Sequence, residues 1–202
     1  MSKIIAFAGL DASGKTTQAK LLKKKLEKNG KSVFLCNPMH HPKHTKKLYS
    51  AGTKLKVDYE DYFGSEIVGI LHLVDVWNYI NNISKKYNKY DYIICERYFL
   101  DFYVYSPLLK SNLDFQKYNI NAFSEPNIYI FLDITPQESK NRIKNRDEVK
   151  CRKSKFQSSA RARELFLKEI QKYKNYKIVN AHNKSVNDIH AEIYNSLKTL
   201  NL

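Results

Sequence analysis

The residues with the clearest chemical purpose form one short stretch near the amino terminus, which reads G-L-D-A-S-G-K-T from Gly9 to Thr16. This is the G-x-x-x-x-G-K-[ST] spacing of a phosphate-binding loop, whose glycines let successive backbone N–H groups face phosphate oxygens. Lys15 would bring a positive charge to the β and γ phosphates of a nucleotide, and the Thr16 hydroxyl would bind Mg²⁺. The stretch predicts a site for ATP and magnesium, and the alternative is a glycine turn that binds nothing.

The segments around this loop predict the fold. An apolar run at 4–8 precedes it, and a lysine-rich helical pattern follows and stops at Asn29-Gly30, a C-terminal stop signal. Four more short apolar runs predict strands at 32–36, 91–95, 127–132 and 176–179. Because helical patterns separate the strands, the sequence predicts an α/β fold of three layers, with one five-stranded parallel sheet between helices.

A second polar group follows the third predicted strand, where Glu96, Arg97 and Tyr98 stand in succession. The carboxyl ends of parallel strands form the edge at which open α/β sheets bind ligands. An acid and an arginine at this edge therefore indicate a second part of the site, with a surface ion pair as the alternative. Further along, Thr135 to Glu138 have the spacing of a capping box that begins a helix.

Residues 62–83 show a strong helical period. The apolar stripe of this segment consists of Ile67, Ile70, Leu71, Val74, Trp77 and Ile80. The opposite face carries His72, Asp75, Val76 and Tyr79, whose polar members are spaced so that they can reach one ligand. An ordinary solvent-exposed face is the alternative.

Residues 39–58 predict a loop and a short helix, and their three histidines favour a solvated turn over a metal site because no carboxylate stands at ligand spacing.

Length and composition limit the class of protein. A chain of 202 residues with 43% hydrophobic residues predicts one globular domain over 1–202. Its three cysteines are far apart in the sequence and do not form a zinc motif, which indicates reduced thiols in a cytoplasmic protein. No apolar run approaches the ~20 residues of a membrane span.

The formal net charge of +15 suggests polyanionic partners, and two kinds compete. One is nucleic acid, and the other is small phosphorylated ligands bound in a basic cleft. The lysines are scattered along predicted helices and lack the arginine–aromatic interleaving of a nucleic-acid module. We therefore expect phosphorylated small molecules rather than nucleic acid.

Several motifs together resemble the thymidylate kinase family over nearly the whole chain. Residues 7–22, F-A-G-L-D-A-S-G-K-T-T-Q-A-K-L-L, are very similar to the opening of these enzymes. Residues 96–98 resemble their D-R-[YFWH] motif, with Tyr105 where the family often has a tyrosine. Residues 131–138 resemble the L-D-x-x-P-E segment that leads to the lid, and residues 180–185 are similar to the D-A-x-x-S turn.

The resemblance implies a P-loop nucleoside-monophosphate kinase with ATP and Mg²⁺ as donor, a lid at about 146–160 and a homodimer. Four residues are expected to be catalytic: Lys15, Arg97, Asp11 and Glu96. ATP would contact Gly9, Asp11, Ala12, Ser13, Gly14, Lys15, Thr16, Thr17, Arg142 and Arg146, with Thr16 and Glu96 serving the metal. The acceptor would contact His72, Asp75, Val76, Tyr79, Arg97, Tyr98, Tyr105 and Arg152. The lid cations would be Arg146, Lys150, Arg152 and Lys153.

Three departures from the family pattern concern the acceptor side. The family's R-E-P after the second strand is C-N-P at 36–38. The F-A-x-D-R of the third helix becomes H-L-V-D-V, so that His72 replaces the base-stacking aromatic and Val76 the base-reading arginine. The asparagine expected after D-R-Y aligns with Phe102. We therefore predict that thymidylate is a poor or non-exclusive substrate; the alternative is that a neighbouring aromatic residue supplies the lost contact.

Two other functions remain open at this point. A deoxynucleoside kinase needs a base to take the proton of a hydroxyl, and Glu96 would be that base, whereas a monophosphate oxygen is already anionic. A nucleotide-binding regulatory protein with little transferase activity is the other alternative. The D-A-S spelling of the loop favours the monophosphate kinase, while a motif that begins E-R favours the nucleoside kinase.

Overall fold

The computed structural model describes residues 2–40, 43–105, 125–144, 159–200 and 202. At its centre lies an all-parallel sheet of five strands in the order β2-β3-β1-β4-β5. The strands are β1 (Lys3–Gly9), β2 (Val33–Cys36), β3 (Tyr92–Glu96), β4 (Ile128–Asp133) and β5 (Tyr176–Asn180). The predicted α/β fold with five parallel strands is confirmed, and each predicted strand end lies within one residue of the observed one.

The central strand β1 explains why these runs are so apolar. It pairs with β3 on one side and β4 on the other, so that Ala6 stands opposite both Cys95 and Tyr129. Helices cover both faces of the sheet, and every residue from Ile4 to Leu10 is buried. A parallel strand that is covered on both faces requires continuous rather than alternating hydrophobicity.

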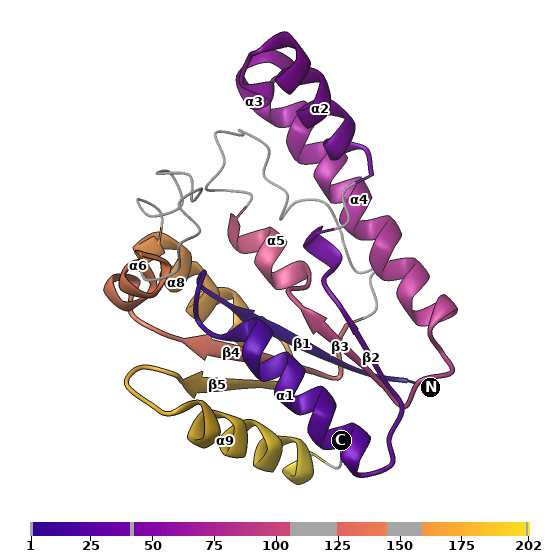
Figure 1. Cartoon of the computed structure of the whole chain (residues 1–202), viewed down its shortest axis with the longest axis vertical. Helices are drawn as coiled ribbons and strands as arrows, with labels where there is room; N and C mark the ends of the chain where they lie inside the picture. The colour runs from indigo at the N-terminus through magenta and orange to yellow at the C-terminus, as the bar shows by residue number, and fades with distance from the viewer. Residues whose placement is uncertain (1, 41–42, 106–124, 145–158, 201) are drawn as a thin grey trace.

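Helices α1 (Lys15–Lys28) and α9 (Val186–Thr199) lie side by side across one face of the sheet (Figure 1). Helices α5 (Phe99–Tyr105) and α8 (Ser159–Glu169) pack together across the other, α6 (Pro136–Lys144) follows β4, and a 3₁₀ turn, Ile170–Lys172, follows α8. Helix α1 ends as predicted, with Gly30 at a φ of 76° just beyond its cap. No helix in these described stretches is long and apolar enough to cross a membrane.

The segment between β2 and β3 contains more helix than predicted. A 3₁₀ turn (Pro38–His40) leads to α2 (Thr45–Leu55), α3 (Tyr59–Phe63) and the long α4 (Ser65–Lys86). Figure 1 shows α2 and α3 beside the amino-terminal part of α4, projecting away from the sheet; we call these three helices the arm. The predicted helix start at Tyr62 is wrong because Gly64, with a φ of 84°, separates α3 from α4.

The face of α4 that carries His72, Asp75, Val76 and Tyr79 is not the solvent-exposed face that was the alternative prediction. On that face Val76 is 1% exposed and Asp75 is 5% exposed. Four members of the apolar stripe remain exposed instead, by 37–54%; we call Ile67, Ile70, Val74 and Trp77 the α4 stripe. Because α4 is apolar around most of its circumference, its period alone did not specify which face turns inward.

The strand order also determines where a ligand can bind. From β1 the chain passes through α1 to β2, on the far side of β3, whereas from β3 it continues to β4 on the other side of β1. The connections after β1 and β3 therefore diverge, which leaves a crevice between their carboxyl ends. The phosphate-binding loop and Glu96-Arg97 border this crevice.

Candidate active site

The phosphate-binding loop joins β1 to α1 and depends on unusual backbone angles. Gly9 has a φ of 145°, and a Cβ there would lie 2.7 Å from the carbonyl oxygen of Leu132 and 2.8 Å from Ser13 Oγ. Gly14, at a φ of 101°, is the left-handed N-cap of α1. Ala12 also has a positive φ of 59°, at a cost of about 1–2 kcal/mol for a residue with a Cβ. Left-handed residues of this kind gather backbone N–H groups into an anion-binding concavity.

Lys15 is folded against this loop. Its Nζ donates to the carbonyl oxygens of Gly9 at 2.9 Å and Leu10 at 2.7 Å, and it lies 3.4 Å from Ser13 Oγ. Burial and, to a smaller extent, the charge of Arg97 lower the pKa of Lys15 to about 7. A bound phosphate would favour the protonated ammonium. Lys15 Nζ therefore lies against the loop, where the lysine of a G-x-x-x-x-G-K-[ST] motif can contact nucleotide phosphates.

Thr16 and Glu96 meet across the crevice although 80 residues separate them. Thr16 stands in the first turn of α1, and Glu96 is the last residue of the neighbouring strand β3. Thr16 Oγ1 donates a hydrogen bond of 2.6 Å to Glu96 Oε1. Two side-chain oxygens at one edge suit Mg²⁺, which takes one or two protein ligands and completes its shell with phosphate and water. Within the described ranges no cluster of three or more His, Cys, Asp or Glu offers another metal site.

Arg97 occupies the centre of the crevice. It follows β3 with a φ of 73°, and its backbone N–H donates to the carbonyl of Phe7 at 2.9 Å. Its guanidinium pairs with Asp11 of the loop through Nη2 and donates from Nη1 to Asp101 Oδ1 at 2.9 Å. Its Cζ lies 5.4 Å from the centre of the Tyr105 ring. With a side chain only 16% exposed, Arg97 belongs to the interior of the site rather than to a surface ion pair.

Asp101 is the residue of this group that the sequence reasoning missed. It is fully buried in α5, four residues after Arg97. Because Arg97 precedes that helix with a positive φ of 73°, helical spacing gave no signal for this pair. Burial raises the pKa of Asp101 to about 6, although the charges of Arg97 and Lys15 act in the opposite direction. Burial alone would lower the pKa of Arg97, but Asp101 and Asp11 hold it above its usual value.

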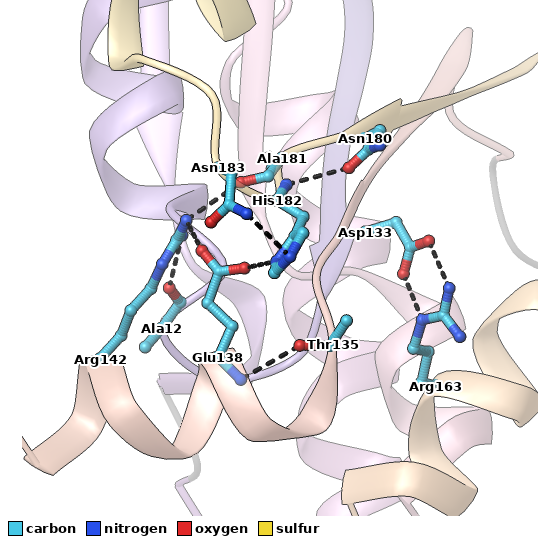
Figure 2. A network of polar contacts seen from close by, with 10 residues as sticks. All are labelled: Ala12, Asp133, Thr135, Glu138, Arg142, Arg163, Asn180, Ala181, His182 and Asn183. Carbon is cyan, nitrogen blue, oxygen red and sulfur yellow. Dashed lines mark hydrogen bonds and ion pairs between the residues drawn. The ribbon is translucent and has the colours of Figure 1, made fainter.

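Arg142 joins the loop to the turn that follows β5, as Figure 2 shows. Its guanidinium donates to the carbonyl of Ala12 at 3.3 Å and to that of Ala181 at 3.0 Å, and it pairs with Glu138. Glu138 also pairs with Nδ1 of His182. The predicted ATP-binding Arg142 thus lies directly beside the phosphate-binding loop, between α6 and the turn that follows β5.

The same view shows how β4 is joined to α8 and how α6 begins. The Asp133 carboxylate at the end of β4 receives Nε and Nη2 of Arg163 at 2.7 and 2.8 Å (Figure 2). Thr135 Oγ1 accepts the Glu138 N–H at 3.2 Å, which confirms the predicted cap of α6. The buried Ser139 of that helix donates to the carbonyl of Asp11 at 2.7 Å. These contacts brace the loop from the β4 side.

The acceptor residues predicted on α4 have structural partners. Asp75 accepts hydrogen bonds from the backbone N–H groups of His44 and Thr45, from the Thr45 hydroxyl and from the His44 ring, at 2.7–3.0 Å. Burial opposes ionisation, but these hydrogen bonds prevail and lower the pKa of Asp75. Asp75 therefore caps α2 and ties it to α4.

The other acceptor candidates are divided between the crevice and the core. His72 lies parallel to Phe102 of α5 with ring centres 5.9 Å apart, and burial lowers the pKa of His72. Val76 faces the core, and Tyr98 is 1% exposed and packs edge-to-face against Tyr129. The structure thus brings Tyr105 to Arg97 but buries Tyr98 within the core.

The remaining candidates are less engaged or lie elsewhere. Thr17 is exposed at the start of α1, and Tyr79 is half-buried on α4, where burial raises its pKa. Arg146, Arg152 and the lid cations Lys150 and Lys153 lie outside the described residues, as does most of the predicted lid.

A parallel sheet of this order, opened at its central strand by a phosphate-binding loop that faces a buried arginine, defines the chain as a P-loop nucleotide kinase. The family model described as thymidylate kinase matches residues 7–193. A probable thymidylate kinase of Methanococcus aeolicus is 30% identical over 212 residues, which cover 98% of this chain and 96% of the relative. The chain belongs to the thymidylate kinase family.

Solved structures agree on the fold. The thymidylate kinase of Candida albicans, an enzyme of broad substrate specificity, superposes with a TM-score of 0.75 at 21% identity. That match covers 98% of this chain and 92% of the other. A deoxyadenosine kinase from M. mycoides, solved with dCMP and dCDP, gives a TM-score of 0.64 at 19% identity and covers 97% of this chain and 99% of the other.

Proposed function

We propose that this protein transfers the γ-phosphoryl group of ATP to a nucleoside monophosphate and so forms a nucleoside diphosphate. The observation that carries the proposal is the crevice between β1 and β3, which brings together Lys15, the Thr16–Glu96 pair and Arg97. Such a site can hold two phosphate groups face to face between cations. Phosphoryl transfer asks the protein for this positioning and charge stabilisation rather than for covalent chemistry.

Each side chain has a role in this scheme. Lys15 leaves the carbonyls of the loop and neutralises the transferring phosphate, while Arg97 binds the acceptor phosphate with its planar guanidinium. Asp11 orients Arg97 from the loop. Because the attacking oxygen of a monophosphate is already anionic, the reaction requires no general base.

Thr16 and Glu96 are the residues that would hold Mg²⁺, and their two adjacent oxygens fit that ion. An ion held there would supply positive charge that stabilises the phosphates. The hydrogen bond between Glu96 and Thr16 also bears on the nucleoside kinase alternative, because it holds the carboxylate at the donor side of the crevice. This arrangement favours a monophosphate over a nucleoside hydroxyl as acceptor.

The nucleobase of ATP would lie against Arg142 and the turn after β5. Arg142 reaches both the loop and Ala181, and the exposed His182 and Asn183 extend the same surface (Figure 2).

On the acceptor side we propose that thymidylate is not an exclusive substrate. Val76 faces the core without a polar group for the base, and Asp75 is occupied by α2.

We further propose that the protein forms a homodimer through the α4 stripe. Its members stand at 67, 70, 74 and 77, which is the alternating spacing of three and four residues with which two helices pack side by side. A contiguous exposed stripe of this kind, on a helix that projects from the body, favours a second copy as its cover. The surrounding arm adds the exposed Tyr49, Leu55 and Tyr62.

The dimer is tested by Val74→Glu, which places a charge in the middle of the stripe. We expect a dimer mass for the wild type and a monomer mass for the variant in sedimentation equilibrium. Asn82→Glu on an exposed part of the same helix is the matched control and keeps the wild-type mass. A wild type that is monomeric at high protein concentration would refute the dimer.

The proposed activity is tested by ATP consumption with a panel of nucleosides and nucleoside monophosphates, with Mg²⁺ present and after its removal by chelation. We expect Mg²⁺-dependent ADP formation with monophosphates and none with nucleosides. Turnover with nucleosides alone would establish the nucleoside kinase, and no turnover with any acceptor would establish a regulatory nucleotide-binding protein.

The buried thiols of Cys36 and Cys95 form a hydrogen bond of 3.6 Å rather than a disulfide, which fits a reducing compartment. We therefore infer that the protein acts in the cytoplasm, as one kinase domain over 1–202.

A further inference from the structure

The function proposed above gives no role to Asp101, a buried charged residue of α5. Asp101 has no exposed surface, yet its carboxylate lies among charged side chains rather than in an apolar environment. Placing a carboxylate in the interior costs several kcal/mol unless charges and hydrogen bonds compensate it. An amide or an apolar residue would avoid that cost, so a carboxylate at this position indicates that its charge interacts with specific neighbours.

The hydrogen bonds of Asp101 involve Arg97 and the residue that follows it, Tyr98. Oδ1 accepts from Nη1 of Arg97 at 2.9 Å, and Oδ2 lies 3.4 Å from the backbone N–H of Tyr98. The backbone N–H of Asp101 donates to the Tyr98 carbonyl at 3.1 Å, so α5 begins by folding back on the Arg97 segment. Asp101 thus holds both the guanidinium and the backbone turn that presents it.

Arg97 needs such support because its backbone is strained. A φ of 73° is unfavourable for a residue with a Cβ and persists only where the surroundings impose it. Asp11 and Asp101 hold two different nitrogens of the planar guanidinium, and the Tyr105 ring lies near it. The guanidinium has five N–H donors, so this clamp leaves donors for phosphate.

We propose that Asp101 is a positioning residue for phosphoryl transfer: with Asp11 it clamps the Arg97 guanidinium in the orientation that receives the acceptor phosphate. This inference rests on the proposed function. Asp101 touches neither nucleotide; it acts through Arg97. A misplacement of about 1 Å in a phosphate-binding group can cost about a hundredfold in rate, which sets the scale of the expected effect.

The test is a double-mutant cycle with Asp101→Asn and Arg97→Ala, measured as kcat/KM for thymidine monophosphate and deoxyadenosine monophosphate. We expect Asp101→Asn alone to lower the value by about 10–100-fold. In the Arg97→Ala background the same change should cost less than about threefold, because the group that Asp101 positions is already gone. Asp101→Glu should recover part of the loss, and the KM for ATP should stay within about twofold of the wild type.

Glu164→Gln is the matched control, since Glu164 forms an exposed pair with Arg161, and it should leave kcat/KM unchanged. An equal loss from Asp101→Asn in both backgrounds would mean that the residue only supports folding, and no loss in either would mean that Arg97 needs no clamp. Both results overturn the proposal.

A second measurement does not depend on activity and separates this inference from the proposed function. In NMR of the arginine side chains, the clamped Arg97 guanidinium of the wild type should give separate Nη signals. In Asp101→Asn these should merge as the group rotates freely, while the signals of Arg163, held by Asp133, stay unchanged. Unchanged Arg97 signals overturn the proposal, and a wild type that shows the clamp but phosphorylates no monophosphate refutes only the proposed function.

Discussion

The crevice between β1 and β3 and the arm formed by α2, α3 and α4 use similar residues in different ways. In the crevice, polar side chains meet at strand ends and hold one another, as Thr16 does with Glu96 and Asp11 with Arg97. On the arm, Asp75 uses both carboxylate oxygens to cap α2, and the apolar stripe faces outward. The crevice is therefore built for phosphate, whereas the arm serves packing first and leaves little for reading a base.

The pKa shifts of the buried charged groups also differ between the crevice and the arm. In the crevice, burial is the main cause that lowers the pKa of Lys15 to about 7 and raises that of Asp101 to about 6. The charged forms of both side chains are therefore destabilised. On the arm, hydrogen bonds lower the pKa of Asp75, so its charged form is stabilised. Perturbed groups of the first kind are typical of functional sites, and groups of the second kind stabilise the fold.

The largest expected effect tests the crevice as a phosphate site. Replacing Lys15 with Ala should lower kcat by about a hundred- to a thousandfold, because the charge acts mainly on the transition state. The circular dichroism spectrum should remain that of the wild type. Full turnover by the variant would remove the phosphate-binding loop from the mechanism.

Arg97 should rank second. Arg97→Ala should lower kcat/KM for the acceptor by about a hundredfold, and Arg97→Lys should restore only part of it, since an ammonium cannot hold two oxygens in one plane. Steady-state kinetics with ATP saturating provides the measurement. If both variants use acceptor as well as the wild type does, Arg97 has no part in the crevice chemistry.

The third prediction concerns what the arm has lost. A base-reading arginine contributes about 1.5–3 kcal/mol, and Val76 cannot replace it. We expect kcat/KM for thymidylate to lie within about a hundredfold of that for another common monophosphate, the range that ~3 kcal/mol allows. The comparison requires the full panel of monophosphates at saturating ATP and Mg²⁺. A larger preference for thymidylate would show that the arm reads the base by another contact.

The smallest effect should separate the structural role of Asp75 from catalysis. Asp75→Asn should lower the free energy of unfolding at pH 7 by about 1–3 kcal/mol, since the cap of α2 loses its charged acceptor. Because the folded pKa of Asp75 is depressed below 3.8, its stabilisation is fully present above that pH and is lost as the pH falls through the folded value. Urea unfolding of wild type and variant should therefore differ less and less below pH ~3.8.

The exposed Asp61 provides the control for this measurement, and Asp61→Asn should change stability by less than about 0.5 kcal/mol at every pH. A difference between wild type and Asp75→Asn that stays constant with pH would mean that the Asp75 charge does not stabilise the arm.

The sequence by itself determined the five strands, the phosphate-binding loop and the Glu96-Arg97 pair. These features follow from short-range rules: continuous hydrophobicity in covered parallel strands, glycines at the two ends of a loop, and polar residues directly after a strand. The N-cap at Thr135 is of the same kind and is confirmed by the hydrogen bond from the Glu138 N–H, whereas the Glu138 carboxylate pairs with Arg142 and His182. Each of these rules can be checked within about ten residues of sequence.

Only the tertiary structure decided which face of α4 turns inward and what its polar residues contact. A helical period shows that an apolar face exists, but not whether the sheet or a second chain covers it. The sequence likewise left Asp101 out of the site, because its role depends on a turn in which Arg97 adopts a positive φ and brings its guanidinium back onto α5. Contacts of this kind form between elements, and their free energy depends on burial that no local pattern records.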